Sequence, residues 1–193
     1  KVAAIAAAIA EGLRLGGVLP VLKHIPGHGR ANADSHLRLP TVDIDRATLE
    51  ATDFAAFCPL KSLPLGMTAH VVFSKIDPVL PATTSSKIIR EVIRGFIGFD
   101  GLLMSDDVSM GALSGSIAER TRASLAAGCD VVLHCNGKLD EMQAVAAAAP
   151  ELSGAAARRA DAALAGRLPA SEIDLVAARR EFDAMIANAA PKR

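Results

Sequence analysis

Short apolar segments alternate with helical segments along most of this chain, and this alternation limits the fold more than any other feature. Each apolar segment is short enough for a buried strand, and a segment rich in helix formers precedes each one. The predicted strands are 18–22, 65–73, 101–107 and 130–136, and the predicted helices before them are 1–15, 45–57, 85–96 and 116–127. Strands that alternate with helices form parallel βαβ units, so the sequence predicts an α/β fold.

Local signals support these helices. Gly16-Gly17 ends the first helix, Gly128 ends the fourth, and a serine at position 85 or 86 caps the third. Only helical segments follow the last strand, namely 139–149, 153–165 and 171–189. The chain is therefore predicted to hold about four βα units followed by C-terminal helices.

Polar residues lie at the carboxyl end of every predicted strand. Because the carboxyl ends of parallel strands meet at one edge, in a closed barrel as in an open sheet, we expect these side chains to converge. They are Lys23-His24, Thr68 with His70, Ser105-Asp106-Asp107, and His134 with Asn136. No GxGxxG or GxxxxGK[ST] motif is present, so the sequence predicts no nucleotide-binding loop of those types.

The charge balance argues against several kinds of partner. Lysine plus arginine and aspartate plus glutamate both number 21, so no basic excess predicts binding to nucleic acid or to a membrane. The apolar runs are well below the about 20 residues that span a bilayer. The three cysteines form no CxxC pair and no secretory leader precedes the first helix, so we expect a soluble, cytoplasmic protein without a cofactor.

The stretch KHIPGHGRANADSH, residues 23–36, contains three of the five histidines. His24, His28 and His36 are possible metal ligands together with Asp34, but the proline and glycines between them are incompatible with a helical HxxxH pair, and the loop has no second carboxylate. In a second interpretation, Asp34 orients the ring of His36 and stabilises its charged form for proton transfer. The residues alone disfavour the metal site and leave open proton transfer and an ordinary polar loop.

Asp106 and Asp107 directly follow the apolar residues 102–104. Adjacent side chains of a strand point to opposite sides, so only one carboxylate is expected to face the strand-end site. Asp107 has a structural explanation as a helix cap or an Asx turn, which leaves Asp106 as the stronger candidate. We expect His70 to be a hydrogen-bonded, half-buried residue near the site, with no assigned role.

Four motifs resemble those of the bacterial β-N-acetylglucosaminidases of glycoside hydrolase family 3. They are KHIPGHG at 23–29, DSH at 34–36, MTAHV at 67–71 and GFDGLLMSDDVSMGAL at 98–113, in the family's order and at compatible spacing. The resemblance implies a TIM-type (β/α)8 barrel that removes terminal β-linked N-acetylglucosamine through a covalent glycosyl-aspartate intermediate. It also implies that the substrates are cell-wall muropeptides in peptidoglycan recycling.

The resemblance further implies a role for each motif. Asp106 matches the family's nucleophile, His36 its general acid/base, and Asp34 the partner of that histidine. Lys23 and His24 match the pair that contacts sugar hydroxyls. Retaining glycosidases usually employ two carboxylates, whereas here an imidazole with an ordinary pKa of about 6.5 replaces one of them.

The same resemblance implies that part of the barrel is absent. The family's barrel has eight strands, and its first half carries an Asp and Arg residues that hold the sugar. We therefore expect residues 1–193 to be the C-terminal portion of one catalytic barrel domain, to need the N-terminal half as a partner, and to be inactive alone. A β-glucosidase-type hydrolase of the same family and a non-catalytic half-barrel remain as alternatives.

Overall fold

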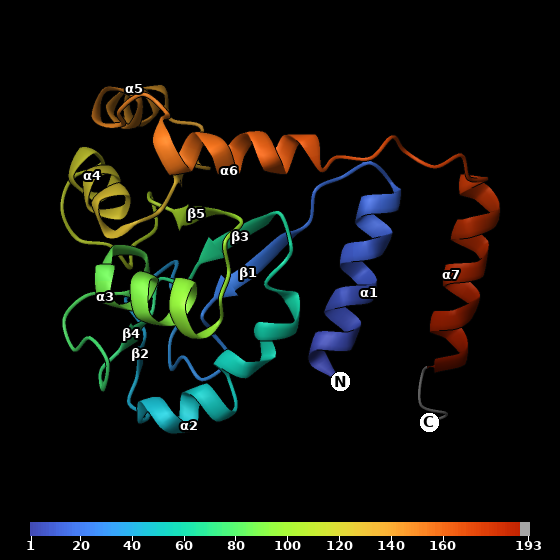
Figure 1. Cartoon of the computed structure of the whole chain (residues 1–193), viewed down its shortest axis with the longest axis horizontal. Coiled ribbons are helices and arrows are strands. Elements are labelled where there is room, and N and C mark those ends of the chain that lie inside the picture. The colour runs from blue at the N-terminus through green and yellow to red at the C-terminus, as the bar shows by residue number, and fades with distance from the viewer. Residues whose placement is uncertain (190–193) are drawn as a thin grey trace.

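The computed structural model describes residues 1–189 and confirms the α/β class (Figure 1). Four strands form one parallel sheet in the order β1-β3-β5-β6. They are β1 (Val21–Ile25), β3 (Leu65–Thr68), β5 (Leu102–Asp107) and β6 (Val131–Leu133). In the part of the chain that the structure describes, β1 and β6 are edge strands, so this sheet is open and not a closed barrel.

The first strand begins later than the sequence pattern predicts. After α1 (Val2–Leu15), Gly17 adopts a positive φ of 77° that turns the chain out of the helix. Pro20 has no N–H to donate to a neighbouring strand, so pairing begins at Val21. The predicted bounds of 18–22 were therefore wrong, and the lysine–histidine pair lies inside β1 instead of after it.

The predicted strand 65–73 consists of two strands in different sheets. Its second part, β4 (Val72–Phe73), pairs in parallel with the short β2 (Thr41–Val42), which the sequence analysis did not predict. Between the two parts, the amide of Ala69 donates to the carbonyl of Ile25 on β1. This bond continues the β1–β3 ladder, and after it the chain leaves the main sheet in a bend that carries His70.

Side-chain caps mark the starts of the three α-helices between the described strands, at Asp45, Ser85 and Ser116. Ser85 accepts a hydrogen bond from the amide of Ile88, as predicted for the third helix. Ser116 and Glu119 form a capping box at the start of the fourth, which ends at Gly128 with a φ of 117°. The helices and turns are α2 (Arg46–Ala51), η1 (Phe54–Ala56), η2 (Cys58–Leu60), η3 (Ala82–Thr84), α3 (Ser86–Ile88), η4 (Ile89–Phe96), α4 (Ile117–Ala127), α5 (Leu139–Ala148), α6 (Gly154–Ala165) and α7 (Leu175–Ala189).

Three predicted helices differ from the observed ones. The segment 45–57 is α-helical only in α2 and continues as 3-10 turns, and 85–96 is mostly a π-helix. The last helix begins at Leu175 and not at position 171, because the amide of Ser171 bonds the carbonyl of Leu15 and Asp174 caps the helix start.

The core lies between the main sheet and the helices that follow its strands. Phe54 and Phe73 meet edge to face with ring centroids 5.4 Å apart. A Cβ at Gly66 of β3 would lie 2.8 Å from the ring of Phe99, so glycine permits this packing. The core also includes Ile25, Leu49, Ile88, Val92, Ile93, Ile97 and Leu103. This packing fixes the strands whose carboxyl ends carry the polar residues.

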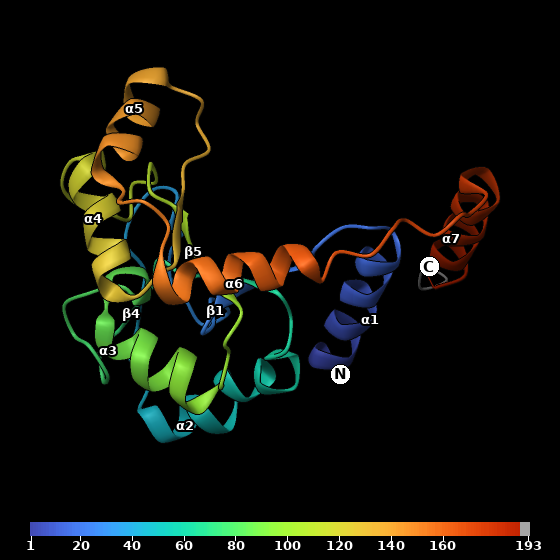
Figure 2. The same ribbon diagram turned by 45° about the horizontal axis from the view of Figure 1, so that its top comes forward.

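α1 and α7 lie to one side of the sheet, and α7 follows α6 through an extended segment (Figures 1 and 2). The apolar row of α1, Val2, Ile5, Ile9 and Leu13, recurs at helical spacing and is between 41% and 73% exposed. None of the described helices combines the length and the apolar content needed to cross a bilayer.

Candidate active site

The ends of β1 and β5 bring a histidine and a carboxylate together. Nε2 of His24 on β1 lies 3.6 Å from Oδ2 of Asp106 on β5. The side chains of His24 and Asp106 are 30% and 15% exposed, so the pair is recessed but reachable by a ligand. These two strand ends therefore converge, as the sequence predicts.

Asp106 and Asp107 use their carboxylates differently. The carboxylate of Asp107 accepts hydrogen bonds from the amide and hydroxyl of Ser109, at 2.9 and 2.6 Å, and from the amide of Cys135 at 3.2 Å. In contrast, Asp106 accepts the amide of Asp107 at 2.8 Å through Oδ1, and its Oδ2 faces His24. Asp107 thus holds the turn after β5, and Asp106 is the carboxylate free for chemistry.

The surroundings of His24 favour its neutral form. Burial is the largest effect and lowers the pKa of His24; Asp106 opposes this, while Lys23, His28 and His70 lower the pKa further. A neutral ring at pH 7 can hydrogen-bond a sugar hydroxyl without forming a full ion pair with Asp106. Lys23 is exposed on the same strand and adds a cationic donor.

His70 is fully buried, whereas the sequence analysis expected it to be half-buried. Its Nε2 donates to the carbonyl of Asp107 at 3.0 Å, and its Nδ1 lies 2.7 Å from Oγ1 of Thr83. The hydroxyl of Thr68 lies 2.8 Å from the same oxygen. Burial, the largest effect, lowers the pKa of His70, which favours the neutral ring that this chain of hydrogen bonds requires. His70 therefore fixes the backbone next to Asp106.

Thr83 is a residue that the sequence analysis missed. It lies in η3, outside the strands, and its hydroxyl also lies 3.1 Å from the carbonyl of Ala69. A serine or threonine that follows a strand by more than ten residues has no local pattern that assigns it to the strand end. The tertiary packing alone brings Thr83 to His70.

Asp34 and His36 form a hydrogen-bonded pair on the loop between β1 and β2. Oδ1 of Asp34 lies 2.8 Å from Nδ1 of His36 and accepts the backbone N–H of His36 at 2.9 Å. The backbone bond first, and then the side-chain bond, lower the pKa of Asp34, so the carboxylate stays charged beside the ring of His36. The side chains are 59% and 74% exposed, and within residues 1–189 no hydrogen bond or ion pair joins them to Asp106.

The three histidines of residues 23–36 each have a separate partner. His24 faces Asp106, Nε2 of His28 lies 3.3 Å from the hydroxyl of Ser35, and His36 pairs with Asp34. Across the described part of the chain, no group of three or more His, Cys, Asp or Glu side chains is arranged to hold a metal ion. The geometry of the loop thus offers an acid–base pair.

A third histidine–carboxylate pair lies after β6. Nε2 of His134 is 2.9 Å from Oε2 of Glu141 on α5, and the side-chain amide of Asn136 donates to the same oxygen at 2.7 Å. These two bonds lower the pKa of Glu141 to about 2. The pair ties α5 to the end of β6, so His134 has a structural role here.

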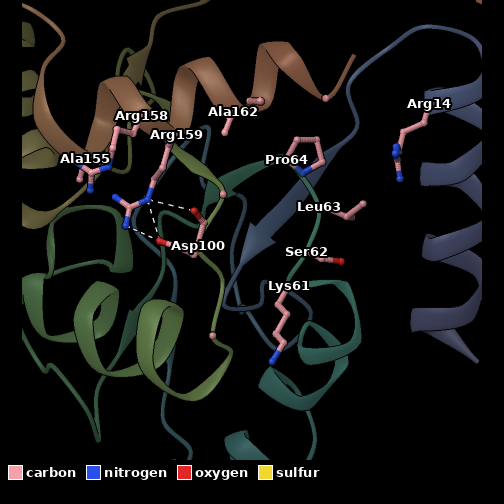
Figure 3. A pocket seen from close by; sticks show the side chains of 14 residues that line it. Arg14, Lys61, Ser62, Leu63, Pro64, Asp100, Ala155, Arg158, Arg159 and Ala162 are labelled. Carbon is pink, nitrogen blue, oxygen red and sulfur yellow. Dashed lines mark hydrogen bonds and ion pairs between the residues drawn. The ribbon is translucent and has the colours of Figure 1, made fainter. Parts of the chain in front are cut away.

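A cavity of about 670 Å³ lies next to the amino ends of β3 and β5 (Figure 3). It is lined by α1, α6 and the turns that precede β3 and β5, including Pro64 and Gly101. Arg159 of α6 points toward Asp100, and their closest nitrogen and oxygen atoms are 2.6 Å apart. Asp106 does not line this cavity, so it is separate from the candidate active site.

The parallel strands, the intervening helices and the polar strand ends define an α/β domain built of βαβ units. The sequence profile of the glycosyl hydrolase family 3 N terminal domain matches residues 1–165. The chain therefore belongs to glycoside hydrolase family 3.

Two curated relatives that match this chain in sequence are β-hexosaminidases. The β-hexosaminidase of Alkalilimnicola ehrlichii is 47% identical over 129 residues, which are 65% of this chain and 37% of the relative. The β-hexosaminidase of Chromobacterium violaceum is 37% identical over 187 residues, 95% of this chain and 52% of the relative. The chain thus spans about half, or less, of the length of these relatives.

Solved structures show the same fold. NagZ from Neisseria gonorrhoeae in complex with N-trifluoroacetyl-D-glucosamine is 32% identical with a TM-score of 0.72, covering 97% of this chain and 52% of that one. A glycoside hydrolase family 3 β-N-acetylglucosaminidase from Paenibacillus sp. is 29% identical with a TM-score of 0.71, covering 86% and 35%.

Proposed function

We propose that this chain is the C-terminal portion of the catalytic barrel of a retaining exo-β-N-acetylglucosaminidase. The observation that carries the proposal is the presence of two separate groups. Asp106 on β5 has a carboxylate oxygen, Oδ2, that accepts no hydrogen bond within residues 1–189, and the Asp34–His36 pair lies on the loop between β1 and β2. Retention at an anomeric carbon needs a nucleophile and a distinct proton donor.

The two groups suffice for a balanced double displacement. In the first step, an oxygen of Asp106 bonds the anomeric carbon, the bond from that carbon to the leaving oxygen breaks, and the imidazolium of His36 gives its proton to that oxygen. In the second step, neutral His36 takes a proton from water, the water oxygen bonds the anomeric carbon, and Asp106 is released. Asp34 stays ionised and stabilises the imidazolium at the start and end of the cycle.

Lys23 and His24 are proposed to hold the sugar. Both lie at the end of β1, and His24 is adjacent to the proposed nucleophile. In the described chain, β1 and β6 are open edges of the sheet. Further strands that pair with these edges would complete the barrel and supply the remaining sugar contacts.

The substrate class follows from the relatives. The curated relatives described above are named β-hexosaminidases, the Paenibacillus structure is named a β-N-acetylglucosaminidase, and the NagZ structure is a complex with N-trifluoroacetyl-D-glucosamine. These names favour N-acetylglucosamine over the β-glucosidase alternative. We further propose cell-wall muropeptides of peptidoglycan recycling as the physiological substrates and the cytoplasm as the location, on the family resemblance of the motifs.

The test replaces Asp106 in the complete catalytic domain. We expect Asp106→Ala to lose turnover of an aryl β-N-acetylglucosaminide by several orders of magnitude, because no covalent intermediate can form. Asp107→Asn, which keeps an acceptor for Ser109, is the matched neighbour and should retain most of the activity. A slowly hydrolysed fluorinated sugar should add its mass to the peptide that contains Asp106. Near-normal turnover by Asp106→Ala would contradict the assignment of Asp106 as the nucleophile.

A further inference from the structure

The loop that carries Asp34 and His36 rests on the segment that follows β5. The amide of Gly111 donates to the carbonyl of His36, and the amide of Ala112 donates to the carbonyl of Ser35, both at 3.2 Å. We call residues 108–113 the docking segment. Ser35 is only 5% exposed, so the contact buries the centre of the DSH motif.

The docking segment is a direct continuation of the strand that carries Asp106. The amide of Met110 donates to the carbonyl of Asp107 at 3.2 Å, and the carboxylate of Asp107 holds Ser109 as described above. The carbonyl of Asp107 also accepts the bond from His70. These bonds therefore tie the docking segment to the strand end that carries Asp106, while two other bonds, from the amides of Gly111 and Ala112, hold the loop.

Arg120 of α4 holds the docking segment from the other side. One guanidinium nitrogen donates to the carbonyls of Val108 and Met110, at 2.9 and 3.1 Å, and a second donates to the carbonyl of Gly115 at 3.0 Å. Charge-assisted bonds from one rigid fork to three carbonyls restrict the segment. The loop thus rests on a fixed support.

Gly111 is the point of close approach between the two backbones. A Cβ at Gly111 would lie 2.9 Å from the carbonyl oxygen of His36 and 3.0 Å from that of Leu37. Both atoms belong to the main chain, so no side-chain rotation can relieve the overlap. Gly111 is not among the glycines with positive φ. Glycine is therefore needed here for the approach of the loop and not for the turn itself.

We propose that Gly111 is a positioning residue for the proton-transfer loop: with no side chain there, the docking segment holds the backbone of Ser35 and His36 and sets the place of the His36 ring relative to Asp106. The inference rests on the proposed roles of Asp106 and His36. A larger residue at position 111 displaces the loop, while the hydrogen bonds that hold Asp107, and so the strand end with Asp106, stay in place.

The first test measures amide hydrogen exchange in the 193-residue chain. In Gly111→Ala, we expect exchange at positions 111 and 112 to rise about tenfold, the effect of losing one hydrogen bond of ordinary strength. Gly29→Ala is the matched control, because a Cβ at Gly29 of the same loop meets nothing within 4 Å. Amides of β5 and α4 in the same samples report whether the fold persists. Unchanged exchange at 111 and 112 in a folded Gly111→Ala variant overturns the inference.

A second variant covers the case in which Gly111→Ala does not fold. Arg120→Lys keeps the charge but cannot bind three carbonyls at once, so it loosens the docking segment without touching the loop. We expect faster exchange at the same two amides. Protection equal to that of the unsubstituted chain would overturn the inference.

Kinetics of the complete catalytic domain test the positioning role. Gly111→Ala should lower kcat/KM about tenfold for an alkyl leaving group that needs a proton and much less for a dinitrophenyl one, since only the proton transfer is impaired. Gly29→Ala should change neither. An equal loss on both leaving groups overturns the positioning role. If the unsubstituted domain hydrolyses neither substrate, the proposed function fails, while the exchange measurement still decides whether Gly111 holds the loop.

Discussion

Removing the carboxylate of Asp130 should destabilise this chain more than most single substitutions. The side chain of Asp130 is 5% exposed and joins three elements. Its Oδ2 accepts bonds from Arg94 and from the amide of Leu103, both at 2.8 Å, and its Oδ1 accepts a bond from Arg159 of α6 at 3.0 Å. Asp130→Ala leaves the guanidinium of Arg94, which is 17% exposed, without its anion.

The magnitude follows from the groups left unpaired. Breaking a buried ion pair by removing one partner costs about 3–5 kcal/mol, and a buried amide without an acceptor costs about 1–3 kcal/mol. The two costs overlap, because Arg94 and the amide of Leu103 share one oxygen. We expect Asp130→Ala to lower the free energy of unfolding by about 4 kcal/mol. Asp130→Asn keeps an acceptor but loses the charge, so its effect should be smaller.

Urea unfolding followed by circular dichroism measures this effect. Asp183→Ala is the matched control, because Asp183 is 55% exposed and pairs with Arg179 one turn away, an arrangement worth less than about 1 kcal/mol. A loss below about 1 kcal/mol in Asp130→Ala would show that water or a neighbouring group replaces the carboxylate, and the reasoning from buried ion pairs would fail.

Two further predictions concern histidines. His36→Ala should lower the rate of the complete catalytic domain by about 10²–10⁴ on substrates with poor leaving groups and less on activated ones, and an equal loss on both would argue against an acid role. Burial lowers the pKa of His24 and His70 in the folded chain, so unfolding takes up protons as the pH falls through about 6.5, and the free energy of unfolding decreases below that pH. Urea unfolding at pH 7.5 and 5.5 measures this decrease; His70→Gln should reduce it, and an unchanged decrease would show that His70 does not contribute.

Local signals predicted the helices better than the strands. Gly128 and Ser85 act through hydrogen bonds to residues within four positions, so their patterns are visible in the sequence. The break after β3 has no such local cause, because the chain leaves β1 for another distant partner, with the amide of Val72 donating to the carbonyl of Pro40. Strand bounds that depend on distant partners cannot be read from apolar runs alone.

Features of the candidate site that depend on adjacent residues were predictable from the sequence. Strand alternation predicts different surroundings for Asp106 and Asp107, and their hydrogen bonds differ: Asp107 holds Ser109, whereas Asp106 accepts only the amide of Asp107 within the described residues. The links from Thr83 to His70 and from Gly111 to His36 were not predictable. Each link joins segments that are distant in the sequence, and neither a threonine nor a glycine indicates by its type which residue it contacts.

The exposed apolar surface and the open sheet edges of this polypeptide determine how readily it self-associates. The apolar row of α1 faces solvent, and the edge strands β1 and β6 present unpaired backbone groups on their outer sides. Because the formal net charge is zero, copies of the chain do not repel one another electrostatically at neutral pH. Its solubility therefore depends on whatever covers α1 and the sheet edges, and a preparation that leaves them bare is prone to self-association.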